Sequence, residues 1–216
     1  MIPRKEPEEV TALYDGVKNA LDTDYGDGRK VGSCKCGVYL FYDYDAEPIY
    51  VGRTIESLRG RIGRHLTNQR TDAVAMSVLD PFEVAEIEIW PFWDLATVGK
   101  REANAALDRA EYAVYQKALR ESRFSVVLNE KDIKPAENIV LPKSVRVSIL
   151  PARLRESREH PDIRLARRAR TIANLARVIS ERKVTPGIRH SLWAQARRLE
   201  RLAKTRLEEF EQRDDK

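Results

Sequence analysis

The 216-residue sequence predicts an α+β fold, in which helices flank a small antiparallel three-stranded sheet and an all-helical basic extension follows. Three observations predict this fold. Two β-branched and aromatic runs, 37–44 and 49–53, are separated by a turn at 45–48 and should form a hairpin. A third run, 82–90, alternates apolar and acidic residues as a half-buried strand does. After Pro151 the apolar residues recur only at helical spacing.

Helices are expected before and between these strands. Apolar residues recur every three or four positions along 6–22, which predicts an N-terminal helix. Thr54 is a suitable N-cap for a helix over 54–69, whose leucine and isoleucine side chains are spaced by four. A further short helix is expected over 72–79. A long helix over 100–121 carries a stripe of alanine, leucine and valine.

These elements divide the chain into four predicted parts. They are an N-terminal helix and loop at 1–32, a compact α+β domain at 33–134, a linker at 135–151 and a basic helical hairpin at 152–216. Prolines punctuate the linker. Thr185 and Pro186 predict the N-cap and first turn of the second helix of the hairpin.

Charge is distributed unevenly along the chain. Residues 151–216 hold 18 Lys and Arg against 10 Asp and Glu, although the whole chain has a net charge of only +5. A basic part joined to a near-neutral part favours a polyanionic partner such as nucleic acid. A pair of solvated surface helices rich in arginine accounts for the charge equally well.

The sequence also indicates where the protein resides. Cys34 and Cys36 are one residue apart, which is unsuitable for a stable disulfide, so we expect free thiols in a reducing cytoplasm. No apolar run approaches the roughly 18 residues that span a bilayer, and the N-terminal residues lack a signal-peptide pattern. We therefore expect a cytoplasmic protein with no membrane association.

An ordered set of residues in the predicted domain carries the functional information. Gly37-Val38-Tyr39 and Tyr50-Val51-Gly52 lie on the two hairpin strands and are followed by a helical arginine, a later helical glutamate and a later asparagine. This order resembles the GIY-YIG nuclease domain over roughly 33–132. Valines replace the isoleucines of the family triplets, a conservative change in a strand. The resemblance implies hydrolysis of phosphodiester bonds.

The resemblance implies roles for three residues of the hairpin and the following helix. Tyr39 matches the tyrosine that lies near the attacking water as general base or as its positioner, and Tyr50 matches the tyrosine that orients the scissile phosphate. Arg61 matches the helical arginine, and its planar guanidinium suits phosphate oxygens. Because the ordinary pKa of tyrosine is about 10, proton loss from Tyr39 would need help from a nearby group.

Three further residues match the family pattern. Glu111 matches the single carboxylate that holds one divalent metal ion, Mg²⁺ or Mn²⁺. It lies on the apolar stripe of its helix, whereas Glu102 lies about 180° away. His65 resembles an extra histidine of restriction-type members, and its position four residues after Arg61 places both on one helical face. Asn129 matches the asparagine that ends the domain in many members.

Each of these residues also has a purely structural explanation. The two tyrosines could be aromatic side chains that pack across a hairpin. Arg61 and His65 could belong to a solvated basic face, and Asn129 could cap a turn. Glu111 could pair with a neighbouring basic residue. The joint order of the six residues favours the site.

Attachments to such a small catalytic domain must supply its specificity for DNA. Six arginines are candidates for DNA contacts, which would be salt-sensitive and independent of sequence. They are Arg53, Arg64, Arg167, Arg168, Arg197 and Arg198. The leucine spacing of the C-terminal helices equally permits a homodimer, which suits cleavage of both strands of a palindrome.

The function that the sequence favours is a metal-dependent DNA endonuclease, most like a type II restriction enzyme. The alternatives within this class are a phage or mobile-element nuclease and a structure-specific repair nuclease. A catalytically inactive nucleic-acid-binding module is the alternative from another class.

Overall fold

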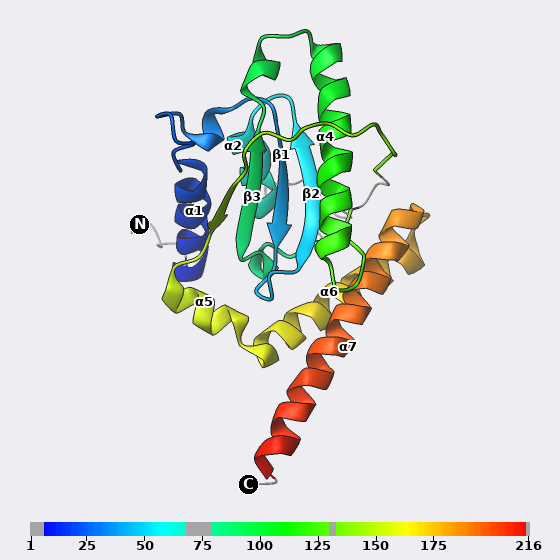
Figure 1. Ribbon diagram of the computed structural model, residues 1–216. Helices are drawn as coiled ribbons and strands as arrows, with labels where there is room; N and C mark the ends of the chain where they lie inside the picture. The colour runs from blue at the N-terminus through cyan, green and yellow to red at the C-terminus, as the bar shows by residue number, and fades with distance from the viewer. Residues whose placement is uncertain (1–6, 68–78, 130–132, 215–216) are drawn as a thin grey trace, which may run out of the picture.

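The computed structural model describes residues 7–67, 79–129 and 133–214 of the chain. Within this part, a four-stranded antiparallel sheet forms the centre, with the strand order β2-β1-β3-β4 (Figure 1). The strands are β1 (Gly37–Tyr42), β2 (Pro48–Thr54), β3 (Glu86–Pro91) and β4 (Val145–Ser148). The α+β class and the antiparallel sheet are therefore confirmed.

The expectation of three strands is wrong by one strand, because β4 was not predicted. This four-residue strand pairs with the outer edge of β3, with Ile87 opposite Val147. It lies within the stretch expected to be a linker. Its residues are alternately exposed and partly buried. So short and half-exposed a run has little sequence signature, and its pairing depends on β3, more than fifty residues earlier.

Helices cover both faces of the sheet. α1 (Glu8–Leu21) and α2 (Leu58–Leu66) pack on one face and α4 (Lys100–Glu121) on the other. Successive side chains of β1 alternate between these faces, so that Tyr39 and Phe41 face α1 and α2 whereas Leu40 faces α4. Every residue of β1 is buried as a result. In the described connections, three short 3₁₀ helices lie at Val31–Ser33, Pro81–Glu83 and Trp93–Ala96.

α2 begins later than the sequence suggested. Thr54 is the last residue of β2, and the N-cap of α2 is Ser57, whose hydroxyl accepts a hydrogen bond of 3.0 Å from the backbone N–H of Gly60. The strand continues to Thr54 because that residue pairs with Gly37 of β1. The short helix expected over 72–79 falls almost entirely outside the described residues.

Three helices form the C-terminal region, namely α5 (Ala152–Glu159), α6 (Pro161–Glu181) and α7 (Pro186–Asp214). α6 and α7 pack against each other at one end of the sheet, and the second half of α7 extends away from it (Figure 1). No helix among the described residues has the length and apolar character needed to span a membrane. Cys34 and Cys36 are both buried and unbridged.

A network of buried ion pairs joins the C-terminal helices to the β1–β2 turn. Arg168 of α6 donates hydrogen bonds to Asp43, at 2.9 Å, and to Glu83, at 3.2 Å. Arg164 binds both carboxylate oxygens of Asp45, at 2.9 and 2.6 Å. Arg198 of α7 donates to a carbonyl oxygen of β2 at 2.8 Å. The arginines that the sequence placed on a basic surface are in part internal structural groups.

Candidate active site

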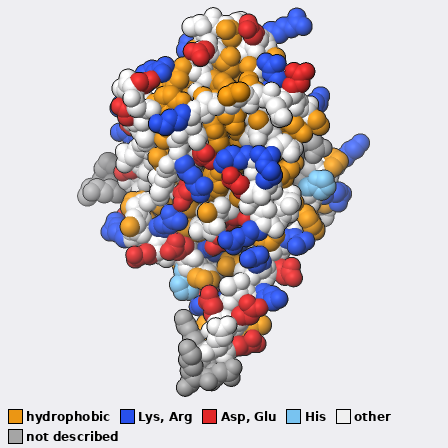
Figure 2. All heavy atoms as spheres, viewed as in Figure 1, with side chains coloured by type: hydrophobic (Ala, Val, Ile, Leu, Met, Phe, Trp, Pro, Cys, Tyr) orange, Lys and Arg blue, Asp and Glu red, His pale blue; other side chains and the backbone are white. Residues whose placement is uncertain are grey.

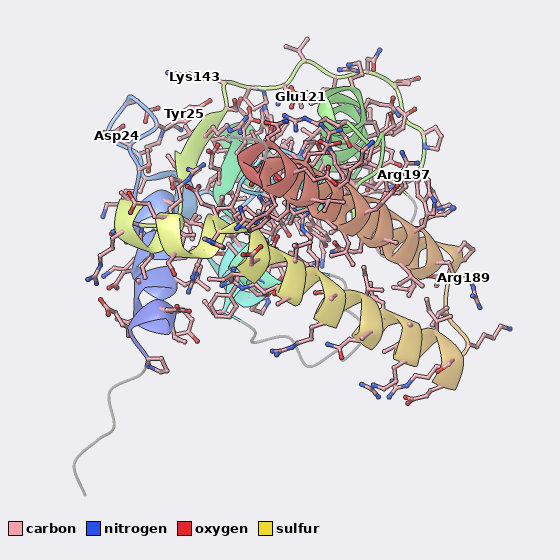
Figure 3. All side chains as sticks on the ribbon, turned by 90° about the horizontal axis from the view of Figure 1, so that it is seen from below. Asp24, Tyr25, Glu121, Lys143, Arg189 and Arg197 are labelled. Atoms are coloured by element: carbon pink, nitrogen blue, oxygen red, sulfur yellow. The ribbon has the colours of Figure 1, made fainter. Side chains whose placement is uncertain are left out.

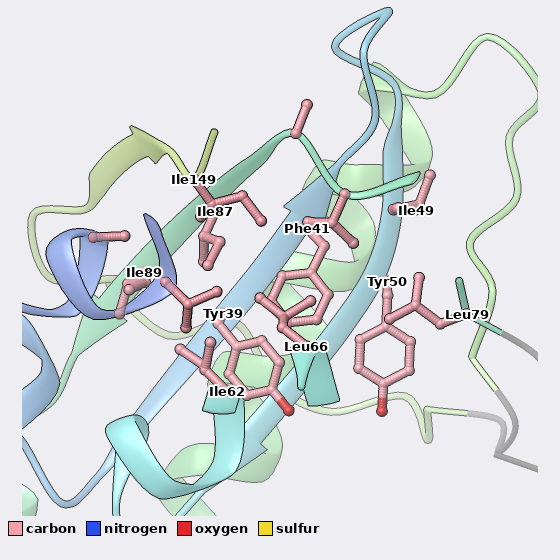
Figure 4. Close-up of a cluster of buried hydrophobic side chains, with 14 of the residues drawn as sticks. Tyr39, Phe41, Ile49, Tyr50, Ile62, Leu66, Leu79, Ile87, Ile89 and Ile149 are labelled. Atoms are coloured by element: carbon pink, nitrogen blue, oxygen red, sulfur yellow. The ribbon is translucent and has the colours of Figure 1, made fainter. Parts of the chain in front are cut away.

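The two motif tyrosines lie next to each other on adjacent strands. Tyr39 of β1 and Tyr50 of β2 are both buried, with their ring centroids 6.4 Å apart and their planes at 27°. Both rings extend toward α2, and their hydroxyl groups point in the same direction (Figure 4). The hairpin register therefore presents two phenolic hydroxyls side by side at one end of the sheet.

The absence of a side chain at Gly52 leaves room for the Tyr39 ring. These two residues are direct partners in the β1–β2 pairing. A Cβ atom built on Gly52 would collide with the hydroxyl and the ring of Tyr39. The glycine of the second triplet is therefore required because the Tyr39 ring lies directly across it, so that the hydroxyl reaches β2, the edge strand of the sheet.

α2 supplies His65 and Arg61 to the same place. The buried His65 ring lies with its centroid 5.8 Å from that of Tyr39 and 5.1 Å from that of Tyr50. Burial raises the pKa of Tyr39 well above its usual value, and the nearby Arg61 guanidinium only partly opposes this. Tyr39 therefore keeps its proton at neutral pH.

Glu111 reaches the site from α4, on the other side of the β2 edge. Arg53 of β2 holds it, with Nε 3.3 Å from Glu111 Oε2, and also contacts Asp108 at 2.5 Å. Burial raises the pKa of Glu111; Arg53 and Arg61 oppose this rise, and the negative charge of Asp108 adds to it. Because the charge of Glu111 also acts on Tyr39, these groups share one electrostatic site.

Asn129 binds the outer edge of β2, the strand that carries Tyr50. Its side-chain amide donates a 2.8 Å hydrogen bond to the carbonyl oxygen of Val51 and accepts a 3.2 Å bond from the Val51 N–H. The preceding Leu128 N–H donates to the Ile49 carbonyl at 2.7 Å. These bonds continue the sheet along β2 as far as Val51 and fix the strand between Tyr50 and Gly52. Asn129 therefore fixes the backbone of β2 at Val51.

The donor chemistry at Glu111 suits one hydrated divalent cation. The side chain of Glu111 is only 20% exposed, and burial raises its pKa although the Arg53 guanidinium beside it opposes that rise. Asp108 lies one helical turn away. Mg²⁺ is commonly bound through one or two carboxylates and retains several waters. No group of three or more potential ligands among His, Cys, Asp and Glu occurs in the described part of the chain.

The six arginines expected to contact DNA occupy different environments. Arg53 organises Asp108, Glu111 and Asn104, so its first role is within the site. Arg64 of α2 and Arg197 of α7 are exposed.

The other three arginines face inward. Arg167 lies over the Phe82 ring and 3.8 Å from Glu83. Arg168 and Arg198 are buried in the ion-pair network, so we do not retain them as DNA contacts.

Sequence reasoning missed two supporting groups. Asp108 and Asn104 lie on the same face of α4 as Glu111, three and seven residues before it, and both contact Arg53. Helical spacing could have identified them as companions of Glu111. The requirement for glycine at position 52 depends on strand register and has no local signal.

The comparisons with known proteins agree with this geometry. The GIY-YIG catalytic domain family matches residues 35–119, a range that contains β1, β2, α2, β3 and most of α4. Neither the curated proteins nor the solved structures include a significant match to the chain. The matched range includes both tyrosine triplets and Glu111, and we conclude that residues 35–119 belong to the GIY-YIG nuclease family.

Proposed function

We propose that this protein is a metal-dependent DNA endonuclease of the restriction type. The observation that supports it best is the meeting of five side chains from four elements, β1, β2, α2 and α4, beside β2. These are Tyr39, Tyr50, Arg61, His65 and Glu111. Each supplies a function that phosphodiester hydrolysis requires, namely positioning of water, binding of phosphate, proton transfer and a metal ligand.

Each side chain of the site has a separate role in the proposed reaction. Arg61 binds the nonbridging oxygens of the scissile phosphate and stabilises the charge that develops there. The hydroxyls of Tyr39 and Tyr50 orient the attacking water and the phosphate. Because Tyr39 stays protonated, His65 is the better acceptor for the proton that the water loses as its oxygen bonds to phosphorus.

Glu111 would hold the divalent ion on the α4 side, supported by Asp108. Bound there, the ion would supply Lewis-acid stabilisation of the phosphoryl and leaving oxygens. Arg53 contacts the carboxylates of both Asp108 and Glu111 and so keeps them in place.

His65 favours a restriction enzyme over the alternatives, since it resembles the extra histidine of restriction-type members and lies within the site. A phage or mobile-element nuclease and a repair nuclease would use the same chemistry on other DNA. A homodimer would suit the restriction role, because a palindromic target is cut on both strands.

Incubation of the purified protein with supercoiled plasmid and Mg²⁺ tests this proposal, with EDTA as the control. Discrete limit fragments are expected for a restriction enzyme. Preference for flaps or junctions over plasmid would instead indicate a repair nuclease. Failure of the wild-type protein to cut any of these substrates would contradict the nuclease proposal and leave a nucleic-acid-binding module.

A further inference from the structure

A cavity of about 250 Å³ lies between α4, the segment that follows it and the start of α7. Aromatic rings of Tyr115, His190 and Trp193 line it, together with apolar side chains such as Val126 and Ile133. None of the described lining residues is acidic. The cavity therefore combines aromatic and apolar walls with uncharged polar groups such as Ser125 and Asn129, and its described lining offers no carboxylate that would repel an anion.

This cavity adjoins the candidate active site through two residues. Asn129 lines it and also binds both backbone polar groups of Val51, the residue between Tyr50 and Gly52. Tyr115 lies four residues after Glu111 on α4, which is one helical turn, or about 6 Å along the axis. A nucleotide near a phosphate held at the active site could therefore reach the cavity.

A cationic side chain lies beside Trp193, one of the residues that line the cavity. Trp193 is 48% exposed, and the Arg197 guanidinium lies 5.5 Å from its ring centroid. Arg189 and Arg197 both project from the outer side of α7 (Figure 3). Among the described residues neither forms a salt bridge. Arg198, the neighbour of Arg197, is instead buried against Glu47.

Charged side chains are arranged differently at this part of α7 and on the face shown in Figure 2. Basic and acidic side chains are intermixed across the middle of the face shown in Figure 2. At the cavity the exposed arginines flank an exposed aromatic ring. A nucleotide has the complementary chemistry, because its base has a flat π-face and its phosphate is anionic.

We propose that this cavity receives one nucleobase of the substrate strand, stacked on Trp193, with an adjacent phosphate on Arg197. The inference rests on the proposed function and extends it, because it gives the nuclease a base-dependent contact beside the scissile phosphate. The base is either already unpaired in the DNA or displaced from a duplex when the protein binds.

Binding measurements in EDTA, which prevents metal-dependent cleavage, test the cavity directly. The probes are a short single-stranded oligonucleotide and an abasic strand with the same number of phosphates. Wild-type protein should bind the strand with bases roughly 10- to 100-fold more tightly than the abasic strand, and Trp193→Ala should remove this difference. Arg197→Ala should weaken binding of both strands equally.

Phe210→Ala is the matched control, since Phe210 is another exposed aromatic residue of α7, nearly five turns further along. It should change neither affinity. Trp193→Phe keeps an aromatic ring and should retain most of the preference for bases. Equal wild-type affinity for the two strands, or a preference that survives in Trp193→Ala, would overturn the proposal.

The source of the base is distinguished with an intact duplex and a duplex that contains one bulged nucleotide. If the base must already be unpaired, Trp193→Ala should weaken binding of the bulged duplex and leave binding of the intact duplex unchanged. If the protein displaces the base from a duplex, the substitution should weaken binding of both duplexes. No effect on either duplex would contradict the proposal.

Plasmid cleavage by the wild-type protein separates this inference from the proposed function. If the protein cleaves plasmid but shows no binding preference for the strand with bases, only the proposal about the cavity is overturned. If the protein prefers the strand with bases but cleaves no DNA, the proposed nuclease function is overturned and the cavity remains a nucleic-acid-binding site.

Discussion

Two groups of arginines in this molecule have the same side chain and opposite roles. At the edge of β2, Arg53 and Arg61 lie beside Glu111 and the buried Tyr39 hydroxyl, and the side chains of Arg53 and Glu111 are partly exposed to solvent. At the junction with the C-terminal helices, Arg168 and Arg198 are almost fully buried against carboxylates. The net charge of a segment therefore does not predict a nucleic-acid-binding surface, because the partners of each arginine decide its role.

Exposure separates the two groups. The side chains of Arg53 and Glu111 are 26% and 20% exposed, so an incoming phosphate or cation can compete for them. At the junction Asp43 is approached by two guanidinium groups, Arg164 at 3.4 Å and Arg168 at 2.9 Å, with all three side chains nearly inaccessible. The first arrangement is suited to a substrate, and the second to holding α6 on the catalytic domain.

The largest expected effect is on catalysis. Tyr39→Phe removes one hydroxyl from the site and leaves the buried ring, so we expect cleavage to fall roughly 10²- to 10⁴-fold. The thermal midpoint should change little. Single-turnover cleavage and thermal unfolding measure the two quantities. Normal cleavage by this variant would place the reacting groups elsewhere.

The opposite outcome is expected at the junction. Arg168→Ala leaves Asp43 and Glu83 buried with fewer cationic partners, so the free energy of unfolding should fall by about 3–5 kcal/mol. Urea denaturation measures it. Arg177→Ala is the control, because the exposed pair with Glu181 should contribute less than about 1 kcal/mol. An unchanged stability with weakened DNA binding would show that Arg168 is a DNA contact after all.

Asn129 should give a smaller and mixed effect. Asn129→Ala leaves both backbone groups of Val51 without their side-chain partner, which should lower the free energy of unfolding by about 1–3 kcal/mol. Cleavage should also fall, since Tyr50 and Gly52 flank Val51, but by less than in Tyr39→Phe. Asn129→Asp keeps the acceptor and should be intermediate in stability. Loss of cleavage as complete as in Tyr39→Phe, with unchanged stability, would indicate that Asn129 contacts the reacting groups.

The smallest expected effect is the pH dependence of metal binding. Burial raises the pKa of Glu111 above the ordinary value of 4.5, so this carboxylate takes up a proton at a higher pH than an exposed glutamate. Because the protonated form does not hold a cation, Mn²⁺ affinity should fall as the pH drops through a value above 4.5. Calorimetric titration of Mn²⁺ at several pH values measures this. An affinity that is independent of pH down to 4.5 would exclude Glu111 as the ligand.

Local patterns in the sequence predicted the hairpin, α4 and most of β3, but the start of the strand expected over 82–90 forms a 3₁₀ helix, Pro81–Glu83, and β3 begins at Glu86. Alternation and helical spacing reflect burial on one or both faces, and burial is visible in the order of residue types. The ordered motif also identified residues that the structure brings together, because Tyr39, Tyr50 and His65 do lie within one cluster of rings.

Features that depend on distant partners were not predictable. β4 is a strand because β3 offers its edge, and its own four residues carry only a weak pattern. The burial of Arg168 depends on Asp43 and Glu83, which precede it by 125 and 85 residues. A single sequence shows that these charges exist and does not show which of them meet.

Plasmid cleavage by Glu111→Gln in Mg²⁺, beside the wild-type protein, tests the central claim most directly. The substitution removes the charge that would hold the cation and nearly preserves the shape of the side chain. We expect cleavage to fall by at least about 10²-fold, while DNA affinity measured in EDTA stays close to that of the wild type. Cleavage within a factor of two of the wild-type rate would contradict a nuclease site built on this carboxylate.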